Sequence, residues 1–267
     1  MNDFPDGNVW LVGAGPGDPE LLTRKAERLI RAASTIFHDA LVGPGILDLA
    51  SPDARRVYVG KRSGRHSKDQ QTIDQLIVAA ALAGERVVRL KGGDPSIFGR
   101  ATEELAACHK AGVRVQVCPG ITAASAAAAS LATSLTLRGL ARKLTFVTAH
   151  ARAGEVLVLD WQALADPGAS LAIYMGKAAA QEISVQLIRA GLPADTPVAL
   201  IENASLPNER QLRTRLDLLH LAAASALGDG PAVLLIGEAM RCRPGTPGLP
   251  GDARLDEEVL QMSRRLL

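Results

Sequence analysis

Residues 9–18 read VWLVGAGPGD, a short apolar run that passes directly into a glycine-rich turn. Apolar runs without polar alternation are typical of strands buried on both faces of a parallel sheet. A helical pattern follows over Pro19–Ala33, with Glu20 in its first turn. The same succession recurs through the first half of the chain and predicts a doubly wound parallel sheet. The strands expected here are Val9–Val12, Thr35–Phe37, Arg56–Val59, Arg86–Leu90 and Val113–Val117, and the further helices are Ser67–Ala83 and Thr102–Ala111.

The pattern starts again at Pro119 and Gly120 with an alanine-rich helix over Ile121–Leu131. From residue 241 on, prolines and glycines crowd together without apolar periodicity, and only Leu255–Leu267 has the composition of a helix. We therefore predict an α/β protein of two domains, residues 1–118 and 119–240, followed by a Pro/Gly-rich tail over 241–267. The strands expected in the second domain are Lys143–Thr148, Ser170–Tyr174, Pro197–Ile201 and Ala232–Ile236.

Composition restricts the partners of this chain. Of its 267 residues, 30 are Lys or Arg and 28 are Asp or Glu, a net charge of +2, which argues against an extended nucleic-acid surface. Aromatic residues make up only 3%, so few rings are available for base stacking. Neither a signal peptide nor a run of about 18 uncharged apolar residues is found, and the three cysteines are not paired in spacing. We expect a cytoplasmic protein that binds neither membrane nor nucleic acid.

Glycines and ionisable residues follow four of the expected strands, where an open parallel sheet binds its ligands. They are Gly13–Asp18, His38 with Asp39, Gly60–Arg62 and Lys91–Pro95. The first loop approaches the dinucleotide pattern GxGxxG, but Asp18 replaces the third glycine and Pro16 removes an amide donor, which argues against a phosphate ligand. In the last loop, adjacent glycines indicate close approach to the backbone, and Asp94 either binds the ligand or caps the helix that follows.

Several segments occur in an order that is specific to one family. They include VGAGPGDPELLTRKA (12–26), VVRLKGGDPSIFGRATEE (87–104), PGITAASAAAA (119–129), IYMG (173–176) and IENAS (201–205). Over about residues 8 to 240 the chain resembles the tetrapyrrole methyltransferases. The resemblance implies S-adenosylmethionine as methyl donor, a homodimer, and a mixed sheet in the second domain, with cofactor and substrate in the cleft between the domains. No metal is expected, because the five histidines show no ligand spacing.

By resemblance, the cofactor is held by residues from both domains. They are Pro16, Gly92, Gly93, Asp94, Ile97, Thr122, Ala123, Met175, Ala204 and Ala232. Backbone contacts at adjacent glycines suit a neutral adenosine and an amino-acid moiety. For Met175, a place in the core is the alternative, although its position directly after a strand favours contact.

The reaction implied is C-methylation of uroporphyrinogen III at two pyrrole carbons, giving precorrin-2. The family pattern makes Asp39 a proton acceptor and Lys61 a proton donor, although these two residues also suit a structural ion pair. The carboxylate arms of the macrocycle call for arginine forks. We expect Arg100 to act on the substrate, with Glu103 orienting its guanidinium and Arg138 reaching in from the second domain.

Some residues depart from the family pattern, and two other functions stay open. The departures are His38 for the usual Tyr, Ala101 for Gly, Ala149 in place of Gly, and Ser134 and Leu137 for Pro and His. They allow a later precorrin as the substrate. A non-catalytic tetrapyrrole-binding protein is the alternative of another class, and the presence of Asp39, Lys61, Arg100 and Glu103 argues against it.

Overall fold

The computed structural model describes residues 4–60, 70–149 and 158–241. The chain forms two compact units that divide between Ala123 and Ala124, whereas the sequence prediction placed the boundary after residue 118. The sequence elements expected over 61–69 and 242–267 lie outside the described residues. Each unit is built around its own five-stranded sheet.

The first sheet is parallel throughout and has the strand order β3-β2-β4-β1-β5. The neighbouring strands β1 and β4 have connections that leave in opposite directions. The β1 connection crosses β4 to reach β2, and the β4 connection crosses β1 to reach β5, with α1 (Arg24–Ala32) and α3 (Ala101–Lys110) on opposite faces of the sheet. Such a switch point opens a crevice at the carboxyl ends of the strands. The strands are β1 (Val9–Gly13), β2 (Thr35–His38), β3 (Arg55–Tyr58), β4 (Val87–Lys91) and β5 (Val115–Cys118).

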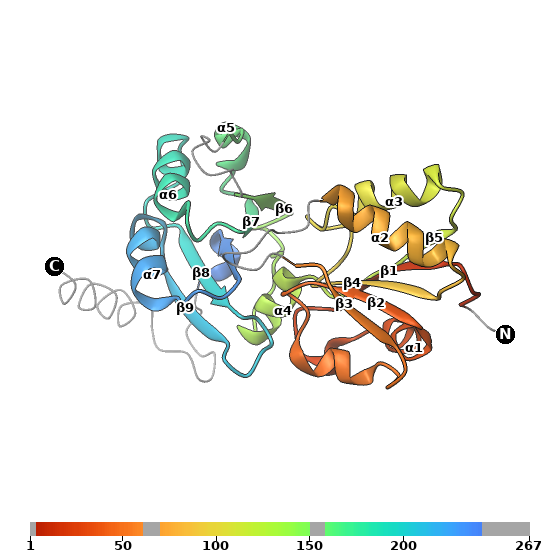
Figure 1. Ribbon diagram of the computed structural model, residues 1–267. Coiled ribbons are helices and arrows are strands. Elements are labelled where there is room, and N and C mark those ends of the chain that lie inside the picture. Colours follow the sequence, from red (N-terminus) through yellow and green to blue (C-terminus); the bar gives the residue numbers. More distant parts are fainter. Residues whose placement is uncertain (1–3, 61–69, 150–157, 242–267) are drawn as a thin grey trace. The chain divides into compact units, whose positions relative to one another are not determined.

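Helices cover both faces of this sheet, with α2 and α3 on one face and α1 on the other (Figure 1). Alternate residues of β1 serve the two faces. Trp10 and Val12 pack with α1, while Val9 and Leu11 pack with α2 and α3, which explains why this strand has no polar position. The elements are α1 (Arg24–Ala32), α2 (Gln70–Leu82), α3 (Ala101–Lys110) and the 3₁₀ turns η1 (Pro19–Leu21) and η2 (Pro44–Leu49).

The second sheet is mixed and has the order β6-β7-β10-β8-β9. Only β6 and β7 pair in parallel, and the other neighbours run antiparallel. With the parallel first sheet, this confirms the predicted fold class. The strands are β6 (Lys143–Thr148), β7 (Ala169–Tyr174), β8 (Pro197–Glu202), β9 (Arg210–Arg215) and β10 (Ala232–Ile236).

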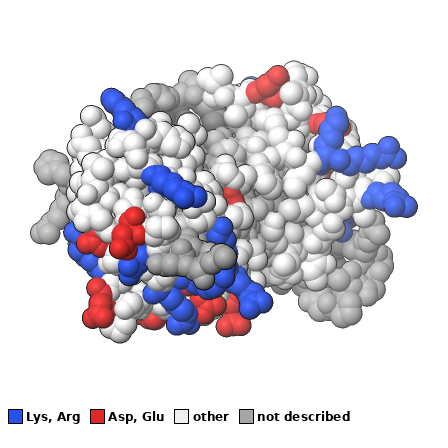
Figure 2. Space-filling model, turned by 90° about the vertical axis from the view of Figure 1, so that its right-hand side faces the viewer, with Lys and Arg blue, Asp and Glu red and all other residues white. Residues whose placement is uncertain are grey.

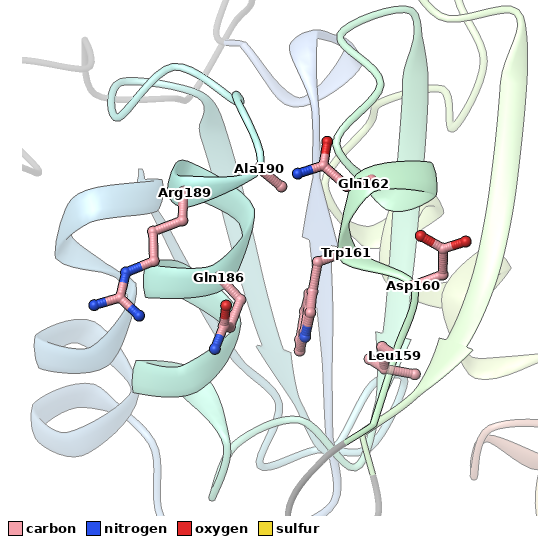
Figure 3. A pocket seen from close by; sticks show the side chains of 7 residues that line it. All are labelled: Leu159, Asp160, Trp161, Gln162, Gln186, Arg189 and Ala190. Atoms are coloured by element: carbon pink, nitrogen blue, oxygen red, sulfur yellow. The ribbon is translucent and has the colours of Figure 1, made fainter.

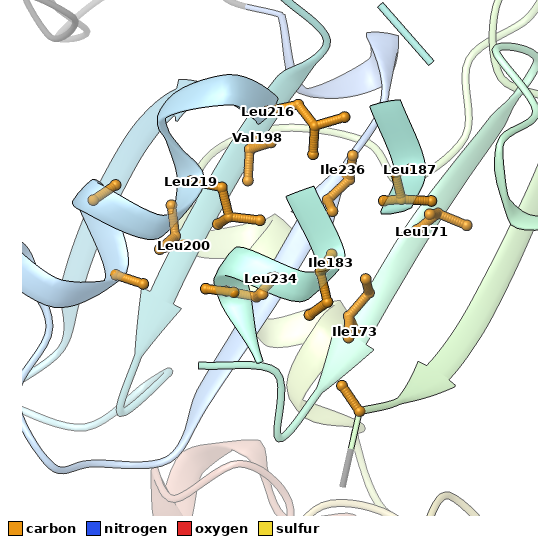
Figure 4. Close-up of a cluster of buried hydrophobic side chains, with 14 of the residues drawn as sticks. Leu171, Ile173, Ile183, Leu187, Val198, Leu200, Leu216, Leu219, Leu234 and Ile236 are labelled. Carbon is orange, nitrogen blue, oxygen red and sulfur yellow. The ribbon is translucent and has the colours of Figure 1, made fainter. Parts of the chain in front are cut away.

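An apolar cluster joins one face of this sheet to its helices (Figure 4). Ile183 and Leu187 of α6 and Leu219 of α7 are completely buried against strand residues such as Leu234. The helices of this unit are α4 (Ala123–Ser130), α5 (Trp161–Leu164), α6 (Ala180–Arg189) and α7 (Leu219–Ala226), and the 3₁₀ turns are η3 (Leu216–Leu218) and η4 (Glu238–Met240).

The structure differs from the sequence prediction in several elements, and helices α5, α6 and α7 were not predicted. The helix expected over Pro19–Ala33 is interrupted, because Thr23 is extended and its hydroxyl accepts a hydrogen bond from the Ala26 amide, starting α1 anew. Strand β9 was not predicted, since its sequence RQLRTR has no apolar run. It forms the edge of the sheet, where polar side chains are tolerated.

Candidate active site

Two glycine-rich loops meet at the switch point of the first sheet. The loop after β1 and the loop after β4 form an isolated bridge, in which the Gly15 amide donates to the Gly93 carbonyl at 3.2 Å and the Gly93 amide donates back at 2.6 Å. Both glycines have positive φ, +68° and +69°, a backbone conformation that residues with a side chain adopt only at a cost in free energy. The paired loops form a backbone platform beside the strand ends.

Two further glycines, Gly13 at the end of β1 and Gly120 after β5, pack tightly against each other and against Gly93 of this platform. A Cβ atom on Gly13 would lie 2.5 Å from the Gly120 nitrogen, and one on Gly120 would lie 2.3 Å from the Gly93 oxygen. Side chains are therefore excluded here for steric reasons, as well as for the backbone conformation of Gly93. We call Gly13, Gly93 and Gly120 the glycine triad.

Asp94 ties the loop after β4 to the glycine triad. Its Oδ2 accepts a hydrogen bond from the Gly120 amide at 3.0 Å, and its Oδ1 accepts from the Ser96 amide at 2.8 Å and from the Ser96 hydroxyl. The loop continues in a turn, in which the Ile97 amide donates to the Asp94 carbonyl. Asp94 thus does not cap α3, which begins after Arg100; its side chain closes a turn within its own loop and joins two strand ends.

A buried group of four charges lies behind this loop. The Arg89 guanidinium donates from Nε to Glu104 at 2.9 Å, from a terminal nitrogen to Asp39 at 3.0 Å, and to the Leu90 carbonyl at 2.7 Å. Lys91 Nζ donates to the other Glu104 oxygen at 2.8 Å. We call Asp39, Arg89, Lys91 and Glu104 the charge cluster; its formal charges cancel.

Burial differs within the charge cluster. The side chains of Arg89 and Lys91 are each 6% exposed and that of Glu104 is 0% exposed, whereas that of Asp39 is 23% exposed. Burial, followed by the neighbouring Arg89 charge, lowers the pKa of Lys91, and Glu104 opposes this shift. Next to Asp39, burial also lowers the pKa of His38, whose ring packs edge-on against Tyr58.

Arg100 and Glu103 form a separate pair that faces solvent. The Arg100 Nε and a terminal nitrogen contact the same Glu103 oxygen at 3.0 and 2.6 Å, and the two side chains are 59% and 43% exposed. Arg100 has a left-handed backbone with φ of +54° at the start of α3. The orientation of Arg100 by Glu103 that the sequence suggested is therefore present in the geometry.

Apart from Arg138 and Lys61, the other predicted site residues lie next to strand ends of the two units. Pro16 follows β1, and Thr122 and Ala123 follow β5. In the second unit Met175 directly follows β7, has φ of +56° and is 48% exposed, which speaks against a place in the core. Ala204 is buried after β8, Ala232 begins β10 and Arg138 is exposed between β-bridge partners 137 and 141. Lys61 lies outside the described residues.

Sequence reasoning missed three members of the charge cluster: Arg89, Lys91 and Glu104. A signal was present, because Arg89 and Lys91 interrupt the apolar run of a strand expected to be buried on both faces. Such cations require acidic partners nearby. Nothing in the sequence pattern distinguishes Glu104 from Glu103 as that partner.

A shallow hollow of about 370 Å³ lies elsewhere, between α5 and α6, and Trp161, Gln186 and Arg189 line it (Figure 3). None of its lining residues is a predicted site residue. Within 4–60, 70–149 and 158–241, no group of three His, Cys, Asp or Glu residues is arranged for a metal ion. The helices of these ranges are also too short or too polar to cross a membrane.

Charged side chains of both signs lie close together toward the lower left of the face shown in Figure 2. This mixing agrees with the net charge of +2. On that face the charges do not form a broad surface of one sign, which is the feature expected of proteins that hold an extended polyanion.

Comparison with known proteins identifies the family. Residues 8–219 match the family model described as Tetrapyrrole (Corrin/Porphyrin) Methylases. A uroporphyrinogen-III C-methyltransferase of Pseudomonas aeruginosa is 48% identical over 236 residues, 88% of this chain and 95% of that protein. A siroheme synthase of Gluconacetobacter diazotrophicus is also 48% identical over 90% of this chain, which spans only 51% of that protein.

A solved structure agrees. The uroporphyrin-III C-methyltransferase of Thermus thermophilus, complexed with S-adenyl homocysteine, is 39% identical and superposes with a TM-score of 0.74 over 88% of this chain and 99% of that one. The parallel first sheet, the mixed second sheet and the glycine-rich strand ends are thus accounted for together: the chain belongs to the tetrapyrrole (corrin/porphyrin) methylase family.

Proposed function

We propose that this chain transfers methyl groups from S-adenosylmethionine to two pyrrole carbons of uroporphyrinogen III, giving precorrin-2. The observation that carries the proposal is the bridge between the loops after β1 and β4, which leaves a side-chain-free platform at the switch point. Support comes from the uroporphyrinogen-III C-methyltransferase of Pseudomonas aeruginosa, because this chain covers 95% of that protein's length. The proposal includes a cytoplasmic homodimer, which stays a prediction.

The platform suits S-adenosylmethionine, because the glycines of the loop after β4 carry no side chain, and Lys91 at its start is buried against Glu104 and so is not available to a phosphate. When bound, the cofactor supplies a methyl group on a sulfonium centre. We assign its binding to the ten residues that the family pattern gives. They are Pro16, Gly92, Gly93, Asp94, Ile97, Thr122, Ala123, Met175, Ala204 and Ala232.

The chain's own task is orientation and proton transfer, since the leaving thioether is neutral. Arg100 presents an exposed guanidinium whose direction Glu103 fixes through Nε and one terminal nitrogen, and its remaining N–H groups can contact a carboxylate arm of the substrate. Arg138 is proposed as a second such contact. Asp39 accepts the proton that the macrocycle loses, and each of its oxygens keeps a lone pair beyond its contacts to Arg89 and Leu41. Lys61 is assigned as proton donor.

A later precorrin is the second candidate substrate. It is favoured by His38, which stands at the end of β2 in edge contact with Tyr58, where the family usually has Tyr. The change lies next to Asp39 and alters the hydrogen-bonding groups available to a substrate at that strand end.

Incubation of the purified chain with uroporphyrinogen III and S-adenosylmethionine labelled in the methyl group tests the proposal. Two labelled methyl groups in a product with the absorbance of precorrin-2 are expected. Transfer only to a later precorrin selects the second candidate. Binding of both ligands without transfer overturns the enzymatic proposal and selects a tetrapyrrole-binding protein.

A further inference from the structure

The charge cluster connects the dry interior of the first unit with the end of β2. Glu104 of α3 is completely enclosed, and its two oxygens are divided between Arg89 and Lys91 of β4. Arg89 extends the contact to Asp39, whose other oxygen accepts a hydrogen bond from the Leu41 amide at 3.1 Å. Asp39 is the member of the cluster with the most exposed side chain. The cluster thus ends at a partly exposed carboxylate.

Fold stability alone gives little reason for such a cluster. Burying four charges has a large desolvation cost, and apolar residues of similar volume often stabilise a protein as well or better. Arg89 directs three separate donors to three acceptors on different segments: Glu104, Asp39 and the Leu90 carbonyl. A planar fork with fixed donor directions holds an acceptor in place more strictly than a lysine does.

We infer that Arg89 is a positioning residue, which Glu104 holds in place and which sets the direction of the Asp39 carboxylate toward the substrate. Lys91 completes the cluster by occupying the second oxygen of Glu104 and balancing its charge. The inference rests on the proposed function, because the direction of the Asp39 carboxylate affects the reaction only if Asp39 accepts a proton from the substrate. Neither Arg89 nor Glu104 needs to touch the substrate.

A double-mutant cycle on methyl transfer tests this role. Arg89→Lys keeps the positive charge but loses the fork, and we expect kcat to fall about 30-fold while KM for S-adenosylmethionine changes less than about threefold. Asp39→Asn alone lowers kcat by about a hundredfold or more. In the Asp39→Asn background, Arg89→Lys adds less than about a threefold loss, because the group that it directs is gone. Independent, multiplying losses would overturn the inference.

Arg213→Lys is the matched control. Arg213 is also a buried arginine on a strand, but it donates to the Met240 and Leu131 carbonyls in the second unit. We expect the kcat of the Arg213→Lys variant to stay within about twofold of that of the wild type. If Arg213→Lys lowers kcat as much as Arg89→Lys does, general loosening explains both results and the positioning role is wrong.

A further variant and a crystallographic readout keep the test independent of folding and of the proposed function. If Arg89→Lys does not fold, Glu104→Gln takes its place, since it preserves volume and one acceptor oxygen, and the same non-additivity with Asp39→Asn is expected. If the wild type transfers no methyl group to uroporphyrinogen III, the proposed function fails. Crystal structures of wild type and Arg89→Lys then decide the positioning alone: a changed Asp39 rotamer supports it, and an unchanged one overturns it.

Discussion

The first turn of α3 carries two adjacent glutamates that face opposite environments. Glu103 pairs with Arg100 in solvent, with side chains 43% and 59% exposed, whereas Glu104 pairs with Arg89 and Lys91 at 0% exposure. Pairs in water contribute little to stability, but a buried pair that loses one member leaves a charge without compensation. A rotation of about 100° between adjacent helix positions therefore separates a contact available to a ligand from a contact on which the fold depends.

The largest effect is expected from Glu104→Ala. The substitution leaves Arg89 and Lys91 buried without their shared acceptor, and it should lower the free energy of unfolding by about 3–5 kcal/mol. Urea denaturation followed by circular dichroism measures this loss. Glu103→Ala is the control, with an expected loss of less than about 1 kcal/mol. Equal losses in the two variants would show that the two environments do not differ as described.

Arg100→Lys should lower turnover strongly and leave stability unchanged, the opposite of what is expected for Glu104→Ala. The lysine keeps the charge but not the bidentate fork, so we expect turnover to fall about a hundredfold, or roughly 2.7 kcal/mol in transition-state stabilisation. Cofactor affinity and the midpoint of thermal unfolding should stay unchanged, because the pair is exposed. Steady-state kinetics, calorimetry and a thermal scan provide the three values. Unaltered turnover would remove Arg100 from the site.

The effect of replacing Asp94 should be intermediate, because its side chain is partly buried and accepts hydrogen bonds from two backbone amides, those of Ser96 and Gly120, and among the residues that the structure describes it pairs with no charged side chain. Asp94→Ala frees the Gly120 amide and should weaken S-adenosylmethionine binding about tenfold, the equivalent of roughly 1.4 kcal/mol. Isothermal titration calorimetry measures the dissociation constant. Ser96→Ala keeps the contact to Gly120 and should bind nearly as the wild type does. An unaltered constant for Asp94→Ala would contradict its assignment to the cofactor site.

A pH-dependent effect concerns Cys108, four residues after Glu104 in α3. Burial, and then the charge of Glu104, raises the pKa of its thiol from 9.0 to about 11. The folded state keeps a proton that the unfolded chain loses, so this contribution to stability is complete below pH 9 and is lost as the pH rises through about 11. Urea midpoints of the wild type should therefore fall more steeply above pH 9 than those of Cys108→Ala. Parallel curves would contradict this assignment.

Patterns local to the chain predicted the fold well. Apolar runs such as Val9–Val12 and Lys143–Thr148 are strands in the structure, and the glycine-rich turns lie at strand ends as expected. Strand β9 escaped prediction because three of its six residues are arginines and its pairing with β8 decides its conformation. The break at Thr23 depends on a single side-chain cap within a continuous helical pattern.

The candidate site was predictable only where it depends on loops. Arg100 and Glu103 are neighbours in sequence, and their pairing follows from helical spacing. The burial of Glu104 depends on Arg89, 15 residues away, through the packing of α3 on β4. Likewise, the contact of Asp94 with the Gly120 amide joins residues 26 positions apart and has no sequence signature.

The glycine triad also sets the point during synthesis at which the binding platform can form. Gly13, Gly93 and Gly120 come together only after β1 has paired with β4 and β5, so the contact closes loops of roughly a hundred residues. A ribosome-bound chain that ends before Gly120 lacks one of the three and the amide that Asp94 requires. Non-local closure of this kind is slow relative to helix formation. The binding platform therefore cannot form before Gly120 has been synthesised, and the ligand cannot stabilise nascent chains shorter than this.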